Sequence, residues 1–384
     1  MTSWHMRCHI YICLLKQGIT KVIDQYTKES KSALQAISDA QRLAFAPMFF
    51  MATVCIRDFG ILSALDNAKD GLSCEQLVSK CSLNDYAVQL LLDVGLSSGV
   101  IYVKEDKYYL SKVGFFILHD KMTRVNMDFT LNVCYQGLAY LKDSLLSGKP
   151  EGLKVFSDAA TIYPVLSTMP QPAKDSWFAF DHFYSDTSSS FMLSKVFSYN
   201  IRKLADLGGN TGNWALSCLK HDAEVQMTIV DLPEQIVLCK QNIANEGMLD
   251  RVSFVATDIL KDSELPADQN WWLSQFLDCF SKEQILFILN KISTAMSDDN
   301  FLFIQELFWD RQRFEAAACS LNASSLYFTT MANGYSRFYS YEVFVDLINK
   351  AGFGIVDVYD HQTTGHTLLV LKKNHSASNV AKQS

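Results

Sequence analysis

The chain has 384 residues, of which 49% are hydrophobic and 20% are charged, and its net charge is −7. This composition is typical of a globular protein with a sizeable core and excludes long disordered tracts. The acidic balance disfavours nucleic acid and anionic membrane surfaces, so we predict neither as a partner.

The ten cysteines are scattered along the chain and form no CxxC pair, which argues against a zinc or disulfide-exchange site. Cysteines buried as small hydrophobic groups suit a reducing compartment, so we predict a cytoplasmic protein without a metal site. The apolar run Ile10–Leu15 is too short for a signal sequence. No stretch reaches the ~18 apolar residues of a membrane helix.

Residues up to about Ala40 are predicted to form an irregular segment and a helix, and three further helices and two short strands are predicted before residue 120. Pro47–Leu65 has apolar residues on more than one side, which predicts one largely buried helix. The sequence SCEQ, which begins at Ser73, is a capping-box pattern that marks the start of the next helix. A third helix is predicted to end near Gly95, and the strands Val100–Val103 and Lys107–Leu110 follow around a charged turn.

This order of a helix, a helix–turn–helix and a hairpin is that of a winged helix, which either reads DNA or forms dimers. From Gln41 to Asp120 the sequence has seven Lys and Arg residues against nine Asp and Glu residues. Neutralising several phosphates requires the opposite balance. We therefore predict that residues 1–120 form a winged-helix-like dimerisation domain and that the protein is a homodimer through it.

Two regions with different secondary-structure patterns follow. Residues 121–200 are rich in aromatic residues and helical patterns, so we predict a helical linker there. From Lys203 on, seven strand-like runs alternate with helix-sized segments, which is typical of a doubly wound α/β sheet. We predict a Rossmann-like domain over residues 201–374 with an antiparallel strand at the sheet edge, and a polar tail at 375–384.

The strongest local motif is DLGGNTG, Asp206–Gly212, which lies between a strand and a helix. Glycines let a ligand approach the backbone, and the free N–H groups of the helix start can bind it. The next strand ends at Asp231, whose carboxylate can accept from both hydroxyls of a ribose. The third strand ends near Asp258, which can accept from an adenine amino group. Each feature alone has a plainer explanation as a turn or helix cap, but together they predict an adenosine site.

With these motifs, the sequence resembles the S-adenosylmethionine-dependent O-methyltransferases of the caffeate and acetylserotonin type. The resemblance covers nearly the whole chain from about Gln41, and it includes the glycine loop, the DLP and TDIL segments and the closing segment Gly334–Phe353. It implies a dimerisation domain at the N-terminus, an acceptor pocket formed partly by residues 121–200, and S-adenosylmethionine as the cofactor. The implied cofactor-binding residues are Asp206, Gly208, Gly209, Gly212, Asp231, Leu232, Asp258, Ile259, Ser274 and Gln275.

The resemblance is weaker for the chemistry. In the family a His after the fourth strand takes a proton from the acceptor hydroxyl, and the matching residue here is Asp278. The first of two supporting glutamates is matched by Glu306, whereas Ser336 stands in place of the second. Methyl transfer from a sulfonium requires alignment and the removal of one proton, which a carboxylate with a pKa raised by burial can accept. Asp278 and Glu306 are therefore candidate catalytic residues.

Two histidines that the family does not require, His182 and His366, are further candidates for the base, and each has a plainer explanation as a hydrogen-bonded structural residue. We count His182 among the catalytic candidates, because its region caps the cofactor cleft in the family. Residues 308–339 are rich in Arg, Asn and aromatic side chains, and either line the acceptor pocket or form a capped helix with surface arginines. In the first case the substrate-binding residues are Asn322, Tyr327, Asn333 and Arg337.

We therefore predict an S-adenosylmethionine-dependent O-methyltransferase that acts on an aromatic hydroxyl, or an aryl carboxyl, of a small molecule. The alternative is a non-catalytic dimeric relative that retains the cofactor fold, because the His and one Glu are replaced. A winged-helix regulator is a third hypothesis, which the acidic balance disfavours. The segments LSQFLDCFS, ELFWDRQRFEAA and SWFAFDHFYSD further resemble a bacterial branch, some members of which are linked to aryl-polyene or flexirubin-like pigments.

Overall fold

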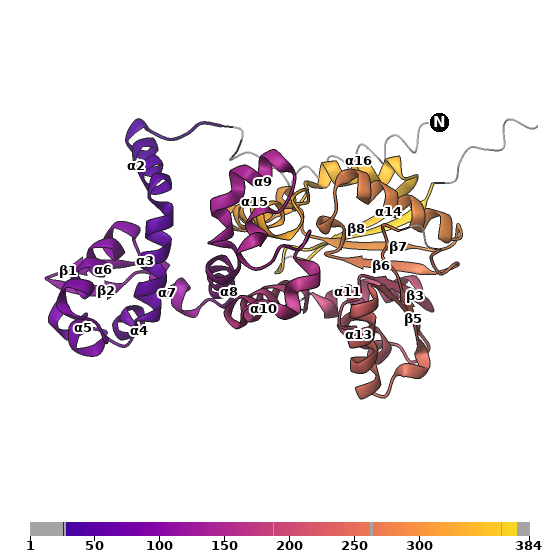
Figure 1. Ribbon diagram of the computed structural model, residues 1–384, viewed down its shortest axis with the longest axis horizontal. Helices are drawn as coiled ribbons and strands as arrows, with labels where there is room; N and C mark the ends of the chain where they lie inside the picture. The colour runs from indigo at the N-terminus through magenta and orange to yellow at the C-terminus, as the bar shows by residue number, and fades with distance from the viewer. Residues whose placement is uncertain (1–25, 27, 187, 262–263, 362, 375–384) are drawn as a thin grey trace, which may run out of the picture. The chain divides into compact units, whose positions relative to one another are not determined.

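The computed structural model describes residues 26, 28–186, 188–261, 264–361 and 363–374 (Figure 1). The chain divides into two compact units. We call Lys28–Val133 with Gln171–Phe180 the helical unit, and Cys134–Pro170 with the residues from Asp181 on the sheet unit. The run Ile10–Leu15 and the polar tail 375–384 lie outside the described residues.

The helical unit has an aliphatic core that includes the fully buried Ile56, Leu62 and Leu92. Its two strands form an antiparallel hairpin whose turn residues, Glu105 and Asp106, both have positive φ, as in a tight two-residue turn. The predicted order of helices and hairpin is confirmed. The elements are α2 (Ala33–Ala44), α3 (Ala46–Asp58), α4 (Ile61–Asp66), α5 (Cys74–Lys80), α6 (Asp85–Ser98), β1 (Ile101–Lys104), β2 (Lys107–Leu110), α7 (Lys112–His119) and α8 (Lys121–Phe129).

Two details of this unit differ from the sequence prediction. Pro47–Leu65 is not one helix, because Gly60, with φ of 81°, ends α3 and begins α4. The third helix does not end near Gly95 but continues to Ser98, and Gly99, with φ of 77°, caps it. The capping box at Ser73 is confirmed, since its hydroxyl accepts from the backbone N–H of Gln76.

The region between the hairpin and the sheet is helical, as predicted, but in short pieces. Several consist of a single turn, and α10 is the longest of them. The pieces are η1 (Thr130–Cys134), η2 (Gly137–Tyr140), α9 (Leu141–Ser147), η3 (Glu151–Val155), η4 (Tyr163–Thr168), α10 (Gln171–Asp186), α11 (Ser189–Val196) and η5 (Phe197–Tyr199).

The sheet unit contains a seven-stranded sheet in the order β5-β4-β3-β6-β7-β9-β8. The first five strands are parallel, and β9 pairs antiparallel with both β7 and β8. The antiparallel strand therefore lies one position inside the edge, and β8 is the edge strand. The strands are β3 (Lys203–Leu207), β4 (Gln226–Asp231), β5 (Val252–Ala256), β6 (Asn270–Ser274), β7 (Leu302–Glu306), β8 (Phe353–Asp360) and β9 (Thr367–Lys373).

Helices cover both faces of this sheet, which gives the predicted doubly wound architecture (Figure 1). Adjacent strand residues point to opposite faces, so Trp271 packs toward α14 and α16 while Trp272 packs toward α11 and α12. Because β3 to β7 are parallel, their carboxyl ends meet at one edge. The remaining elements are α12 (Asn213–His221), α13 (Pro233–Asn245), η6 (Leu249–Arg251), η7 (Leu277–Cys279), α14 (Lys282–Ala295), η8 (Trp309–Arg311), α15 (Glu315–Tyr327), η9 (Phe328–Ala332) and α16 (Tyr341–Lys350).

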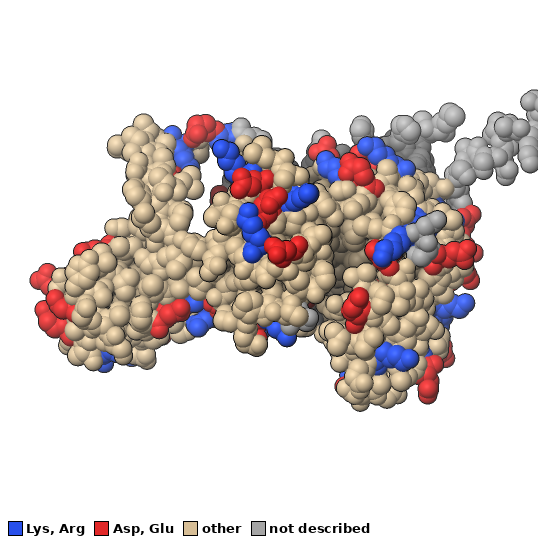
Figure 2. Space-filling model, in the orientation of Figure 1, with Lys and Arg blue, Asp and Glu red and all other residues tan. Residues whose placement is uncertain are grey.

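Charged residues of both signs are mixed over the face shown in Figure 2, without a continuous basic stripe. In the part of the chain that the structure describes, no helix is both long and apolar enough to cross a membrane. The cysteines of the same ranges are all free thiols.

Candidate active site

The glycine loop follows β3 and turns directly into α12. Gly208 and Gly212 have φ of 78° and 83°, a region that side chains other than glycine rarely adopt. A Cβ on Gly208 would lie 2.3 Å from the ring of Phe276, and one on Gly212 would lie 2.7 Å from Sγ of Cys239. A Cβ on Gly209 would lie 2.9 Å from Oδ2 of Asp206. The loop therefore requires these glycines.

Asp231, at the end of β4, is fixed against this loop. Its Oδ2 accepts from the backbone N–H of Asn210 at 2.8 Å, and its Oδ1 accepts from that of Leu232 at 2.7 Å. Burial raises the pKa of Asp231, while these two hydrogen bonds act in the opposite direction. The carboxylate thus lies beside the first turn after β3, as expected for a group that binds a ribose.

Asp206, within β3, is 3% exposed, and its Oδ2 has no hydrogen-bond partner among the described residues. Burial and the charge of Asp231 raise the pKa of Asp206 to about 8. A buried acceptor without a partner is costly, and a cationic ligand group would compensate it. The unpartnered oxygen of Asp206 is therefore consistent with a positively charged cofactor bound at this loop.

The other predicted cofactor residues follow the ends of neighbouring strands. Asp258, after β5, accepts from the backbone N–H of Leu260 at 3.0 Å, and Ile259 is buried. Ser274 ends β6, and Gln275 next to it has a φ of 46° and donates its N–H to the carbonyl of Gln305. With the glycine loop, Asp231 and the exposed Leu232, these residues lie after consecutive parallel strands, at one edge of the sheet.

Asp278 and Glu306 are buried at the same edge, with exposed fractions of 5% and 2%. Glu306 ends β7, and its Oε1 accepts from the backbone N–H groups of Phe276 (3.2 Å) and Leu277 (2.9 Å). Glu306 therefore holds the main chain of the turn that carries Asp278. Burial and the charge of Asp278 raise the pKa of Glu306.

Burial also raises the pKa of Asp278, to about 7, and the negative charge of Asp181 adds to this effect. The thiol of Cys279 acts in the opposite direction, because it donates to Oδ1 of Asp278 at 3.5 Å. Asp181 lies in α10, directly before the predicted His182, which is half-buried. The structure thus brings Asp181 of α10 close enough to Asp278 for its charge to act on that carboxylate.

His366 does not offer a base at neutral pH. It is completely buried, its Nδ1 lies 2.8 Å from the hydroxyl of Thr364, and burial lowers its pKa to about 3.

The four predicted acceptor-binding residues are spread over α15 and the segment after it. Asn322 is half-buried and Tyr327 is buried, both in α15, whereas Arg337 is exposed. Asn333 is 3% exposed, and its amide is already engaged. Its Nδ2 donates to the carbonyl of Cys279 and to Ser336, and its Oδ1 accepts from two backbone N–H groups. This occupied amide argues against contact between Asn333 and a substrate.

Two tyrosines that the sequence analysis did not select also lie around Asp278. The Tyr339 hydroxyl donates to the carbonyl of Phe280 at 2.7 Å, and Tyr163 is a hydrogen-bonding neighbour of Cys279. Tyr163 begins the short helix η4, more than a hundred residues before Asp278, so no local pattern could have indicated it.

Comparison with known proteins agrees with this geometry. Residues 139–354 match the O-methyltransferase domain family, and residues 38–108 match the Dimerisation2-like domain. The chain belongs to the O-methyltransferase family. Members of this family use S-adenosylmethionine, so this is the cofactor of the methyltransferase. The family also favours the hypothesis of an active enzyme over that of a non-catalytic relative.

Two curated relatives carry more detailed names. The methyltransferase is 22% identical over 300 residues to the L-tyrosine C(3)-methyltransferase of Streptomyces lavendulae, a match that covers 77% of this chain and 81% of that protein. It is 24% identical over 172 residues to the 3-hydroxy-5-methyl-1-naphthoate 3-O-methyltransferase of Streptomyces sahachiroi. This second match covers 44% of this chain and 48% of the relative, about half its length.

A solved structure confirms the fold. The S-adenosylmethionine-dependent methyltransferase SibL superposes with a TM-score of 0.67 at 20% identity, over 88% of this chain and 99% of that chain. The Rossmann-like fold with a helical N-terminal domain, as predicted, is therefore that of known methyltransferases.

Proposed function

We propose that this methyltransferase transfers a methyl group from S-adenosylmethionine to a hydroxyl group on the aromatic ring of a small molecule. The observation that carries the proposal is the buried Asp278, whose pKa is raised to about 7. A carboxylate of this kind can take the proton from a phenol at neutral pH. An aryl carboxyl, the other predicted acceptor, is already ionised at that pH and needs no base. The presence of a base therefore favours a hydroxyl over a carboxyl group as the methyl acceptor.

We propose that the carboxyl edge of the sheet holds the cofactor. The glycine loop supplies free N–H groups at the start of α12, and Asp231 accepts from the ribose. The unpartnered oxygen of Asp206 faces the cationic part, while Asp258 and Ile259 hold the adenine and Ser274 and Gln275 line the same edge. When bound, S-adenosylmethionine supplies a methyl group on a positively charged sulfur.

The chain's own part in the reaction is alignment and removal of a proton. Asp278 accepts the proton of the acceptor hydroxyl, and Glu306 holds the turn that carries it through two backbone N–H groups. The negative charge of Asp181 near Asp278 favours its protonated product form. Holding both reactants in line converts a slow encounter into an intramolecular step.

A ring carbon next to the hydroxyl is the second candidate acceptor. The observation in its favour is the relative named as an L-tyrosine C(3)-methyltransferase, whose match covers 77% of this chain. Loss of the phenol proton makes the neighbouring ring carbon nucleophilic. After methylation that carbon loses its hydrogen as a proton and the oxygen regains one, so a single proton is released overall with either product. The proposed link to pigment biosynthesis stays a prediction, as does the cytoplasmic location.

The acceptor atom can be identified with S-adenosylmethionine that carries a carbon-13 methyl group. We expect one or more members of a panel of phenols, catechols, hydroxynaphthoates and tyrosine to gain the label, because the site holds a base. Carbon-13 NMR of the product distinguishes a methoxy carbon from an aryl methyl carbon. Labelled aryl esters alone, or no labelled product across the panel, would contradict the proposal.

Replacement of the proposed ribose-binding residue, Asp231→Ala, should raise the Kd for S-adenosylhomocysteine by about 10- to 100-fold, since hydrogen bonds to a charged group are worth about 1.5–3 kcal/mol. Isothermal titration calorimetry measures this Kd. Glu234→Ala, which removes an exposed acid from the first turn of α13, is the control and should leave the Kd unchanged. Equal Kd values for the two variants would show that Asp231 does not bind the ribose.

Replacement of the proposed base, Asp278→Asn, should lower kcat by about a hundredfold or more and leave S-adenosylhomocysteine affinity within a few-fold. In the unmodified enzyme kcat/KM should rise with pH through about 7, because only the ionised carboxylate accepts a proton. Steady-state rates across this pH range check both points. Asp299→Asn, at an exposed position, is the control. A variant with full turnover would remove Asp278 from the mechanism.

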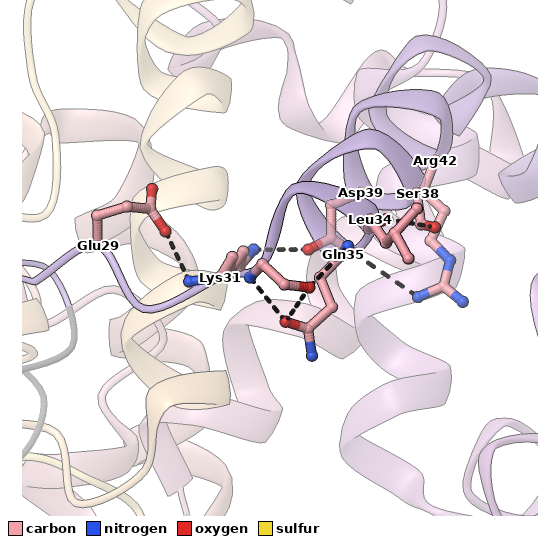
Figure 3. Close-up of polar contacts among 8 residues, drawn as sticks. Glu29, Lys31, Leu34, Gln35, Ser38, Asp39 and Arg42 are labelled. Atoms are coloured by element: carbon pink, nitrogen blue, oxygen red, sulfur yellow. Dashed lines mark hydrogen bonds and ion pairs between the residues drawn. The ribbon is translucent and has the colours of Figure 1, made fainter.

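We also propose that the methyltransferase is a homodimer through its helical unit, which includes the whole region that matches the Dimerisation2-like domain. Helix α2 has no buried residue, and its apolar side chains Leu34, Ile37 and Leu43 are 62–79% exposed. Polar side chains of this helix and of the residues just before it bind one another, as in the pair of Lys31 and Asp39 (Figure 3). An apolar helix face of this kind supports burial against a second copy.

The substitutions Ile37→Glu and Leu43→Glu, made together, should convert the dimer to a monomer, because two carboxylates cannot be buried unpaired in an apolar interface. Sedimentation velocity measures the association state at several concentrations. Gln41→Glu adds a charge to an exposed polar position of the same helix and should leave the dimer intact. A double variant that still sediments as a dimer would contradict the assignment of α2 to the interface.

A further inference from the structure

The turn that carries Asp278, residues Phe276–Phe280, is held from three sides by side chains of other elements. Glu306 accepts from its first backbone N–H groups, and Tyr339 donates to its last carbonyl. Asn333 donates from Nδ2 to the carbonyl of Cys279 at 2.8 Å. The main chain of the turn is thus fixed, whereas the direction of the Asp278 side chain depends on contacts of its own.

One such contact comes from Cys279. Its thiol donates to Oδ1 of Asp278, with 3.5 Å between sulfur and oxygen. Burial and the charges of Asp278 and Glu306 raise the pKa of this thiol well above its usual range. The thiol therefore stays protonated and acts toward the carboxylate as a donor.

Tyr163 completes a chain of donors. Its hydroxyl is a hydrogen-bonding neighbour of the Cys279 sulfur, and Asn333 Nδ2 lies 3.4 Å from the same hydroxyl. The hydrogen bond of Tyr163 opposes the rise in the pKa of the Cys279 thiol, which is the effect of a donor, so the hydroxyl hydrogen points at the sulfur. Burial raises the pKa of Tyr163, so this group also stays protonated. The order of donation is Tyr163 to Cys279 to Asp278.

We propose that Cys279 is a positioning residue for Asp278, and that Tyr163 and Asn333 hold its thiol in the donating orientation. The inference rests on the proposed function, in which Asp278 is the base. The thiol fixes one carboxylate oxygen and leaves the other for the acceptor. It also stabilises the ionised form against the other groups that face Asp278, which are Asp181, Glu306 and Tyr339.

The test compares Cys279→Ala, which removes the donor, with Cys279→Ser, which keeps one. The titration of Asp278 is followed in the full-length protein by NMR of carbon-13-labelled aspartate carboxyl groups, with Asp278→Asn to assign the signal. Cys279→Ala should raise the midpoint by about 0.5–1 pH unit, because a donor to the charged form is lost. Cys279→Ser should stay at or below the original midpoint. Cys319→Ala, at an exposed cysteine of α15, is the control for loss of a thiol.

A second pair of variants removes only the outer donor. Tyr163→Phe should raise the midpoint by less than Cys279→Ala does, and Tyr335→Phe, at an exposed tyrosine near the same turn, should not move it. In the methyl-transfer assay, Cys279→Ala should lower kcat about three- to tenfold, leave KM for the acceptor unchanged and shift the pH profile with the NMR midpoint.

The outcomes separate this inference from the proposed function. An unchanged Asp278 midpoint in Cys279→Ala, with unfolding temperature also unchanged, would overturn the positioning role. Equal upward shifts in the Ala and Ser variants would do the same, because the donor would then not be the cause. A shifted midpoint in a protein that methylates no acceptor would support the contact and overturn the function.

Discussion

The carboxyl edge of the sheet keeps acidic side chains out of water, and most of the site follows from how their charge is tolerated. Asp206, Asp278 and Glu306 are buried there, and Asp231 is half-buried. A buried carboxylate must either receive donors or bind a proton. Backbone N–H groups donate to Asp231 and Glu306, and burial raises the pKa of all four acids, to about 8 for Asp206 and to about 7 for Asp278. This edge suits a cofactor with positive charge, which would favour the ionised form of the acids near it.

The main chain around these acids is held in conformations that few residues tolerate. Gly208 has a positive φ and lies so close to the Phe276 ring that a side chain would not fit, and Gln275, just before Phe276, also has a positive φ. The turn after β3 and the turn after β6 thus pack directly on each other. This packing connects the loop proposed to hold the cofactor with the turn that carries Asp278, so a change in either turn is expected to affect the other.

The sequence predicted the structural features that a local residue pattern determines, such as strands and helix starts. Alternating apolar runs indicated all seven strands of the sheet, and the pattern at Ser73 indicated a helix start. It could not predict the break at Gly60, because a glycine within an apolar run is also compatible with a continuous helix. Asn333 was interpreted as a substrate contact, since only the fold shows that its amide is occupied. Tyr163 was missed because it lies in a short helix more than a hundred residues before Cys279, and only the fold brings the two together.

The two departures from the family pattern, Asp278 for His and Ser336 for Glu, follow from one change in charge. A His base becomes a cation when it takes the proton, and two flanking glutamates stabilise that cation. An Asp base becomes neutral, so neighbouring carboxylates act on its ionised starting form and raise its pKa. Burial and the charge of Asp181 already raise the pKa of Asp278 to about 7. A second Glu at position 336 would raise it further, beyond the range in which a base is ionised at neutral pH. Ser336 instead donates to the Asn333 amide and adds no charge.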